Sequence, residues 1–331
     1  MTWFIFALIC IFGWGSADLF YKKGSDGADP CSHLKTAVWV GLVMGVSSLI
    51  LLPFSESGGN FETLLSNAVS YLPASLGYII SMVIGYAGLR YLELSIVSPV
   101  QNASGALSVV VMAVWFTVRG NASAVMEEFS LLDIAGTILI VAGVISLAFV
   151  EQKISEGGIQ NEAADRIISD NHKISENFRT GALALIFPVL YCVFDTIGTA
   201  ADGIILDEEY GLGLGEIDVL VLYGLTFFAA GIVCFIIICI KEKKIYNPFK
   251  AGERPKALAA VCEEFGQVFY VYAMAGNPIL AAPMVASYCV ISAAAAGIFL
   301  KEKLKAQQYI CIGLVIAGII LLGISEGLQN I

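Results

Sequence analysis

Charged side chains are scarce in this sequence. Of its 331 residues only 14% are Asp, Glu, Lys or Arg, whereas 58% are hydrophobic. A soluble globular domain averages about 25% charged and about 45–50% apolar residues, so a soluble enzyme and a disordered chain are both disfavoured. The net charge of −10 argues against a nucleic-acid partner. The composition is that of an integral membrane protein.

Residues that carry most enzyme chemistry are also few. The only two histidines, His33 and His172, lie outside the apolar runs, and no cysteines have CxxC spacing. No HExxH, GxGD or P-loop motif is present. We therefore expect no metal site, no other cofactor and no enzymatic activity.

Long apolar runs, in contrast, fill most of the chain. A membrane-spanning helix needs about 20 mostly apolar residues. Ten runs qualify, and none alternates with period two as a barrel strand would. The expected spans are 3–21, 34–53, 72–92, 95–118, 130–150, 180–201, 217–240, 256–275, 279–300 and 307–324. The predicted fold class is an all-α integral membrane protein with ten transmembrane helices.

Basic residues gather on one side of the predicted membrane. Of 18 Lys and Arg residues, 17 follow odd-numbered helices, and Arg119 alone lies on the other side. That other side carries an acidic stretch: Asp202, Asp207, Glu208, Glu209, Glu216 and Asp218. The positive-inside rule makes the basic side cytoplasmic. Both termini are then external, and the expected location is a plasma membrane, such as the inner membrane of a bacterium.

An internal repeat underlies the ten helices. Trp14 and Asp18 stand four residues apart in helix 1, and Tyr191 and Asp195 stand four apart in helix 6, 177 positions later. A proline opens helix 4 and another opens helix 9. Each unit has an odd number of helices, so the second unit must enter the membrane inverted, as in many secondary transporters.

The repeat divides the chain into three parts. Residues 1–150 form the first five-helix repeat, 151–179 a cytoplasmic linker, and 180–331 the second, inverted repeat. The linker is predicted from its mixed charges and its lack of an apolar stretch. Small residues such as Gly41 and Gly45 indicate close helix packing within the chain.

In this order, the motifs resemble the drug/metabolite transporter superfamily, and specifically its EamA type. Trp14 and Gly15 match the first-helix pattern of that family. The last two helices of each repeat also match the family's pattern. A proline (Pro99, Pro283) opens the fourth helix, and glycines follow in the fifth (Gly136 and Gly143; Gly313 and Gly318). After helix 9 the chain has Leu300-Lys301-Glu302 where many members have Leu-Gly-Glu. The resemblance implies a ten-helix carrier with its substrate site between the halves.

Polar residues inside the spans are the candidate site, because an ionisable group in a membrane is costly and is usually functional. In helix 8, Glu263, Gln267 and Tyr270 share one face, which is expected to line a cavity. Glu264 lies on another face, which suits helix packing better.

Helices 1, 4, 6 and 9 supply the other candidates. Asp18 with Trp14 is expected near the cytoplasmic mouth, and Asp195 with Tyr191 near the external mouth. An acid beside an aromatic ring can attract a cation or carry a proton. Gln101 and Asn102 after Pro99, and Tyr288 in helix 9, are candidates for hydrogen bonds to a polar ligand. Tyr78 and Tyr86 are expected to be interfacial or packing residues.

We therefore predict a secondary active transporter that moves a small polar or cationic metabolite by alternating access, with proton coupling as one option. A lipid scramblase or flippase, or a channel-like permease, is the alternative. Expected partners are a small-molecule substrate, protons and the lipid bilayer, with no nucleic acid. The chain is expected to be a monomer or a weak homodimer.

The orientation can be tested with reporter fusions. A reporter after Ile331, or within 203–216, should report the external side, because the basic loops anchor the opposite side in the cytoplasm. A reporter within 241–255 should report the cytoplasm. A cytoplasmic C-terminus together with an external 241–255 loop would reverse the orientation.

Overall fold

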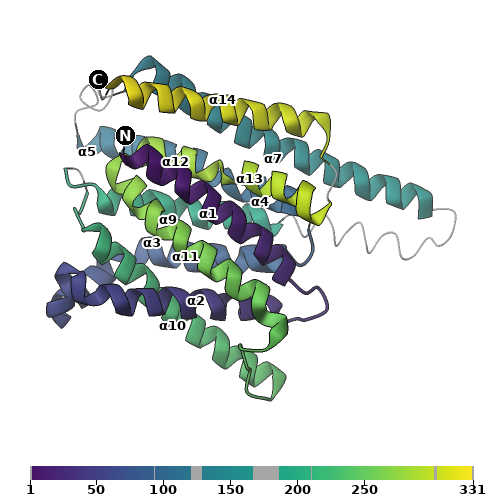
Figure 1. Ribbon diagram of the computed structural model, residues 1–331, viewed down its shortest axis with the longest axis horizontal. Helices are drawn as coiled ribbons and strands as arrows, with labels where there is room; N and C mark the ends of the chain where they lie inside the picture. Colours follow the sequence, from purple (N-terminus) through teal and green to yellow (C-terminus); the bar gives the residue numbers. More distant parts are fainter. Residues whose placement is uncertain are drawn as a thin grey trace.

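Long helices lying side by side make up the computed structural model (Figure 1). The structure describes residues 2–92, 94–120, 129–166, 186–209, 211–301 and 304–329, with side chains except those of 95, 96 and 151–166. Within these ranges no residue is in a β-strand. The all-α membrane fold class is confirmed.

The first half of the chain forms α1 (Thr2–Gly24), α2 (Ser32–Leu51), η1 (Leu52–Phe54), η2 (Glu56–Gly59), α3 (Phe61–Gly88), α4 (Leu94–Asn102), α5 (Ser104–Arg119) and α7 (Leu131–Arg166). The second half forms α9 (Ile186–Leu206), α10 (Glu216–Glu242), η3 (Ala251–Glu253), α11 (Arg254–Gly276), α12 (Pro278–Ala286), α13 (Tyr288–Ala295), η4 (Ala296–Leu300) and α14 (Ala306–Gln329).

Whether the chain has nine or ten membrane-spanning helices depends on whether α11 is counted as one of them. Nine segments of the described chain are long and apolar enough to cross a membrane, and α11 is not one of them. Its length of 23 residues suffices, but Lys256, Glu263, Glu264 and Gln267 make it too polar for that criterion. Because α11 runs alongside α1 between the same two ends of the bundle, we count it as the tenth span.

Several predicted boundaries were wrong. Helix α3 begins at Phe61, not 72, because the side chain of Asn60 caps it by accepting a hydrogen bond from the Glu62 N–H. Helix α7 continues to Arg166, so the predicted linker is helical over 151–166. Its Glu, Gln, Lys and Ala residues are good helix formers. The remaining linker residues, 167–179, and residues 180–185 of the predicted helix 6 lie outside the described residues.

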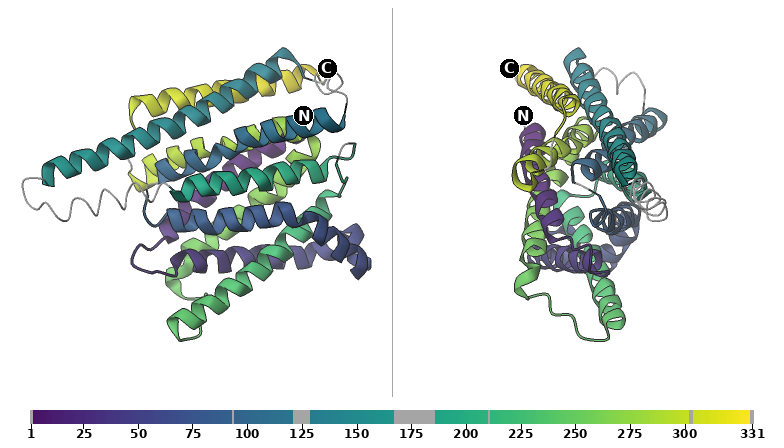
Figure 2. Two further views of the ribbon diagram at one scale, coloured as in Figure 1. Left: turned by 180° about the vertical axis from the view of Figure 1, so that it is seen from behind. Right: turned by 90° about the vertical axis from the view of Figure 1, so that its right-hand side faces the viewer.

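The helices alternate in direction, so the bundle has two distinct ends (Figures 1 and 2). We call one the basic end; it holds the connections 25–31, 89–92 and 243–250. The acidic end holds 52–60, 207–209 and 211–215. The first helix begins and the last helix finishes at the acidic end. This arrangement agrees with the sorting of charge in the sequence, while the side of the membrane to which each end belongs stays a prediction.

Two of the predicted spans are broken in the middle. The fourth is divided at Ala103 into α4 and α5, and the ninth at Ser287 into α12 and α13. Each break lies four residues after a proline, Pro99 or Pro283. Irregular backbone within a membrane is tolerated where it is buried in protein or lines a cavity, and both breaks lie next to the cavity described below.

Four helix pairs supply most of the packing: α1 with α11, α2 with α10, α3 with α9, and α7 with α14. The pair α7–α14 lies at one edge of the bundle and α2–α10 at the opposite edge (Figure 1). Each pair crosses where two glycines meet: Gly13 with Gly266, Gly41 with Gly231, Gly77 with Gly198, and Gly136 with Gly318. The predicted packing role of Gly41 is confirmed.

The set of four helix pairs is unchanged when each helix is replaced by its counterpart in the other half of the chain. The α1–α11 pair then becomes α9–α3, and the other two pairs map onto themselves. Gly13 therefore corresponds to Gly198, 185 positions later. This spacing agrees with the 184 positions between Pro99 and Pro283. The division into domains at 150 and 180 stays a prediction.

The spacing of 177 inferred for helices 1 and 6 was wrong by about two helical turns. Four-residue spacing of an aromatic and an acid recurs by chance in apolar helices, whereas a backbone crossing is fixed by packing. With the offset of 185 positions taken from the glycine crossings, the counterpart of Asp18 is the residue next to Asp202 and not Asp195. Asp202 itself lies within α9, not in the predicted acidic loop.

The glycine crossings can be tested with Gly77→Ala. The added methyl group would lie 2.7 Å from the Gly198 backbone N and 2.9 Å from its Cα, and backbone atoms cannot move aside. We expect overpacking to cost about 1–3 kcal/mol and to lower the thermal midpoint of the purified protein in detergent.

Gly313→Ala is the matched control, because no atom lies within 4 Å of an added methyl group there. Alanine is favoured over glycine within a helix by about 0.5–1 kcal/mol. The control should be neutral or slightly stabilising. Equal midpoints for the two variants would contradict the assigned crossing.

Candidate functional site

A cavity lies between the two halves of the chain. Helices α1, α3, α9 and α11 contribute most of its wall, and the broken helices contribute the residues around their breaks. Its lining extends from the middle of the bundle toward the basic end, where Tyr21 and Leu89 border it. The cavity is therefore displaced from the centre toward the basic end.

Ten of the eleven candidate residues line this one cavity: Trp14, Asp18, Gln101, Asn102, Tyr191, Asp195, Glu263, Gln267, Tyr270 and Tyr288. They come from α1, α4, α9, α11 and α13. The exception is Glu264, which is absent from the lining and lies on another face of α11. The two adjacent glutamates thus lie in different surroundings, Glu263 at the cavity and Glu264 away from it.

Asp18 is held by both halves of the chain. Its Oδ2 accepts hydrogen bonds from the hydroxyls of Ser98 in α4 and Ser292 in α13, each 2.6 Å long. Asn102 supports Ser98 by donating to its carbonyl O at 2.8 Å. Since both serines are fully buried, the carboxyl group is fixed in position by the two broken helices.

Asp195 is fixed in a similar way from the other side of the cavity. The Ser104 hydroxyl, at the start of α5, donates to Asp195 Oδ2 at 2.6 Å. Ser104 is the first residue after the break in the fourth span. Both aspartates therefore depend on the helix breaks for their hydrogen-bond donors.

The predicted placement of the two aspartates at opposite mouths was wrong, because both line the same cavity. Helix α9 begins at Ile186 in the described chain and ends at Leu206, which places Asp195 in its middle rather than near its end. The sequence offered no boundary signal that would have shown this.

Aromatic rings form much of the cavity wall. Trp14 packs against Tyr270, with ring centroids 4.9 Å apart, and against Tyr288 at 5.6 Å. The Trp14 indole N–H donates to the Glu263 carbonyl O at 3.2 Å, which joins α1 to α11. The Trp14 ring is thus held against α11, in the wall that also contains Glu263.

Four tyrosines in the wall were missed as candidates: Tyr21, Tyr78, Tyr86 and Tyr223. Tyr21 and Tyr86 are joined by a 3.1 Å hydrogen bond between their hydroxyls. In the sequence Tyr78 and Tyr86 could not be told from interfacial tyrosines. Their eight-residue separation, which places both on one face of α3, is the signal that could have identified them.

Two amide groups in the wall lack hydrogen-bond partners. The Nε2 atoms of Gln101 and Gln267 are buried and donate to no acceptor in the described structure. The two residues are only 5% and 1% exposed. A buried amide without a partner costs about 1–3 kcal/mol, so such donors in a cavity wall indicate a ligand that accepts hydrogen bonds.

In the part of the chain that the structure describes, the lining contains three carboxyl groups, from Asp18, Asp195 and Glu263, and no Lys, Arg or His. A positive charge that enters this space meets several acids and several ring faces in a medium of low dielectric, where the attraction is strong. Chemically, the cavity is suited to holding a cation.

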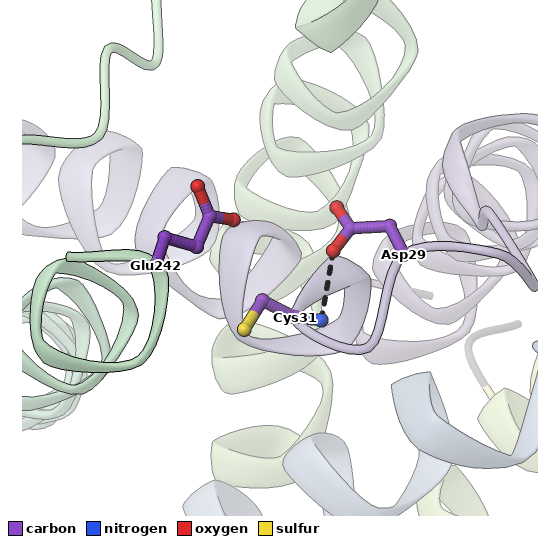
Figure 3. Close-up of side chains that lie close together, drawn as sticks. All are labelled: Asp29, Cys31 and Glu242. Atoms are coloured by element: carbon purple, nitrogen blue, oxygen red, sulfur yellow. Dashed lines mark hydrogen bonds between the residues drawn. The ribbon is translucent and has the colours of Figure 1, made fainter. Parts of the chain in front are cut away.

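A second cluster of potential ligand atoms lies at the basic end, where Asp29, Cys31 and Glu242 approach one another within 4.8 Å (Figure 3). The Lys35 ammonium lies 2.7 Å from Asp29 Oδ2 and 2.5 Å from Glu242 Oε1. Burial acts to raise the pKa of Asp29, but Lys35 outweighs burial and holds that pKa below its usual value. Lys35 already supplies the positive charge, so we assign no metal here.

Two comparisons with known proteins found a similarity to this chain. Residues 210–324 match the model of a family described as the EamA-like transporter family. One solved crystal structure is similar over 97% of this chain and 96% of its own chain, with a TM-score of 0.58 and 13% sequence identity. That identity supports a shared fold only. The search of curated proteins found no match.

The matched segment covers α10 to α14, and the structural similarity extends over both halves. The family is one of multi-pass membrane transporters, which agrees with the apolar helices seen here. The family match over residues 210–324 supports the resemblance of this chain to the EamA type of the drug/metabolite transporter superfamily.

Proposed function

We propose that this protein is a secondary active transporter of a small organic cation. One observation carries the proposal: among the described residues, the cavity between the halves is lined by Asp18, Asp195 and Glu263 and by no basic side chain. Three carboxyl groups so close together repel one another when ionised. Protons or a cationic solute relieve that repulsion.

The aromatic wall narrows the class of cation. A Na⁺ or K⁺ site needs several oxygen ligands around a small ion, whereas eight of the residues that line this cavity are aromatic. Quaternary and other alkylammonium groups are bound by ring faces together with a nearby acid. Trp14, Tyr270 and Tyr288 supply such faces in the cavity that Glu263 also lines.

The unpartnered amides of Gln101 and Gln267 add a second requirement. Each can donate a hydrogen bond, so the preferred solute carries a hydroxyl, carbonyl or carboxyl oxygen besides its cationic group. A small polar metabolite with an ammonium group meets both conditions.

Transport by alternating access is supported by the fold. The site lies between two halves that pack as inverted units, and the cavity extends toward one end only. If the basic end is cytoplasmic, as the charge distribution indicates, this structure represents the inward-facing side of the cycle, in a plasma membrane, with external termini.

The function can be tested with the full chain in liposomes, using tetraethylammonium as the probe. A carrier should show saturable counterflow of labelled tetraethylammonium into liposomes that contain the unlabelled cation. Flipping of a labelled lipid without any counterflow would favour the scramblase alternative instead. Flux that increases linearly with concentration would favour a channel.

Glu263→Gln tests the role of charge. Glutamine keeps the shape of the side chain and is cheaper to bury than a carboxylate, so folded yield should be unchanged. Counterflow of tetraethylammonium per folded molecule should fall at least tenfold, which corresponds to about 1.4 kcal/mol.

Glu264→Gln is the matched control, since the neighbouring residue lies in the same helix but outside the cavity lining. It should retain at least half of the counterflow. Full activity in Glu263→Gln, or equal losses in both variants, would show that the charge at the cavity is not used for transport.

A further inference from the structure

The acidic half of the bundle contains a carboxyl group that the cavity does not use. Asp202 of α9 is fully buried, with no exposed surface. Its Oδ1 accepts a 2.9 Å hydrogen bond from the Tyr71 hydroxyl of α3, and the hydroxyls of Tyr78 and Tyr270 also interact with its carboxyl group. Burying an acid is costly even with hydroxyl partners, so its presence needs an explanation.

Asp202 lies directly behind the cavity wall. The hydroxyls of Tyr78 and Tyr270 are 2.6 Å apart, and Tyr78 also donates to Thr199 at 3.4 Å. These three residues line the cavity, and both tyrosines interact with the charge of Asp202. The tyrosine hydroxyls of the cavity wall therefore lie next to Asp202.

The rest of the acidic half is closely packed. Tyr71, Met112 and Met274 have no exposed surface. A methyl group added at Gly203, next to Asp202, would lie 2.5 Å from Met112 Sδ and 3.1 Å from Met274 Cε. We call Tyr71, Asp202, Met112 and Met274 the acidic-end seal. Methionine side chains repack readily, so a seal built from them can open.

Asp202 occupies the place in the second half that Asp18 occupies in the first. The glycine crossings relate the halves by 185 positions in these helices, which places Asp18 within one residue of Asp202. Asp18 lines the cavity near the basic end, and Asp202 is sealed near the acidic end. When inverted halves exchange conformations, the exposed and the sealed positions exchange as well.

We propose that Asp202 is a second cation-binding residue of the transport cycle, bound to Tyr71 and sealed in this structure, and exposed to the solute in the opposite-facing state. In that state it has the role that Asp18 has here. The Tyr71–Asp202 hydrogen bond holds the acidic end closed. This inference rests on the proposed transport by alternating access, but not on which cation is carried.

Exposure of Asp202 can be measured without a known substrate. Dicyclohexylcarbodiimide modifies carboxyl groups that it reaches in apolar surroundings, and peptide mass spectrometry locates the modified residue. In the full chain in liposomes we expect modification at Asp18 and, more slowly, at Asp202. Tyr71→Phe removes only the hydroxyl and should increase the rate at Asp202 at least threefold, with no increase at Asp18. Tyr246→Phe, in the basic-end connection, is the control and should change neither rate.

Asp202→Asn tests the binding role. Counterflow of tetraethylammonium should fall at least tenfold, while modification of Asp18 and its protection by tetraethylammonium persist, because the cavity at the basic end is intact. If Asp202→Asn does not fold, the comparison of Tyr71→Phe with the wild-type protein still decides whether the seal opens.

The outcomes separate this inference from the proposed function. Modification of Asp202 that depends on Tyr71, in a protein that neither binds nor moves tetraethylammonium, would support the opening of the seal and reject the organic cation. Normal counterflow in Asp202→Asn, with equal modification rates in Tyr71→Phe and the wild-type protein, would overturn the inference and leave the proposed function standing.

Discussion

Contact between glycine backbones at the helix crossings is the constraint on which the rest of this structure depends. Lipid tails are as apolar as the helices, so hydrophobic burial does little to hold membrane helices together. Close packing and hydrogen bonds must do so instead. All four main helix pairs cross at glycines, where a single added methyl group would approach backbone atoms to within about 2.5–3.2 Å. These crossings set how far each helix is shifted along its partner, and therefore which residues meet in the middle.

The cavity exists because two spans are not continuous. The breaks at Ala103 and Ser287 interrupt helices that would otherwise fill the centre. They also place hydroxyl groups where the aspartates need them, Ser104 for Asp195 and Ser292 for Asp18. An acid in a membrane is costly unless it is hydrogen-bonded. The broken helices thus create the space and also stabilise the charges that give it its chemistry.

The two halves of the molecule pack in a similar way, but corresponding residues are exposed to the cavity in one half and buried in the other. Near the basic end the counterpart residues line a cavity, and near the acidic end they are sealed by Tyr71 and by methionines. A rigid scaffold with one open and one closed half is the arrangement that alternating access requires, since a solute must never reach both sides at once.

Composition and the lengths of the apolar runs were enough to establish the membrane class, the alternation of the helices and the sorting of charge between the two ends. These properties are local, because each run of about 20 apolar residues must cross the bilayer wherever it packs. The polar residues within the spans were likewise identifiable, since each is costly there, and ten of the eleven lie at one cavity.

The sequence alone could not show which of these polar residues lie close together in the folded chain. Asp18 and Asp195 were expected at opposite mouths, and Asp202 in a loop, because depth within a helix depends on where the helix begins and how it crosses its neighbour. That register is fixed by Gly13 against Gly266 and Gly77 against Gly198, residues more than 100 positions apart in the chain, so only the tertiary structure could decide it.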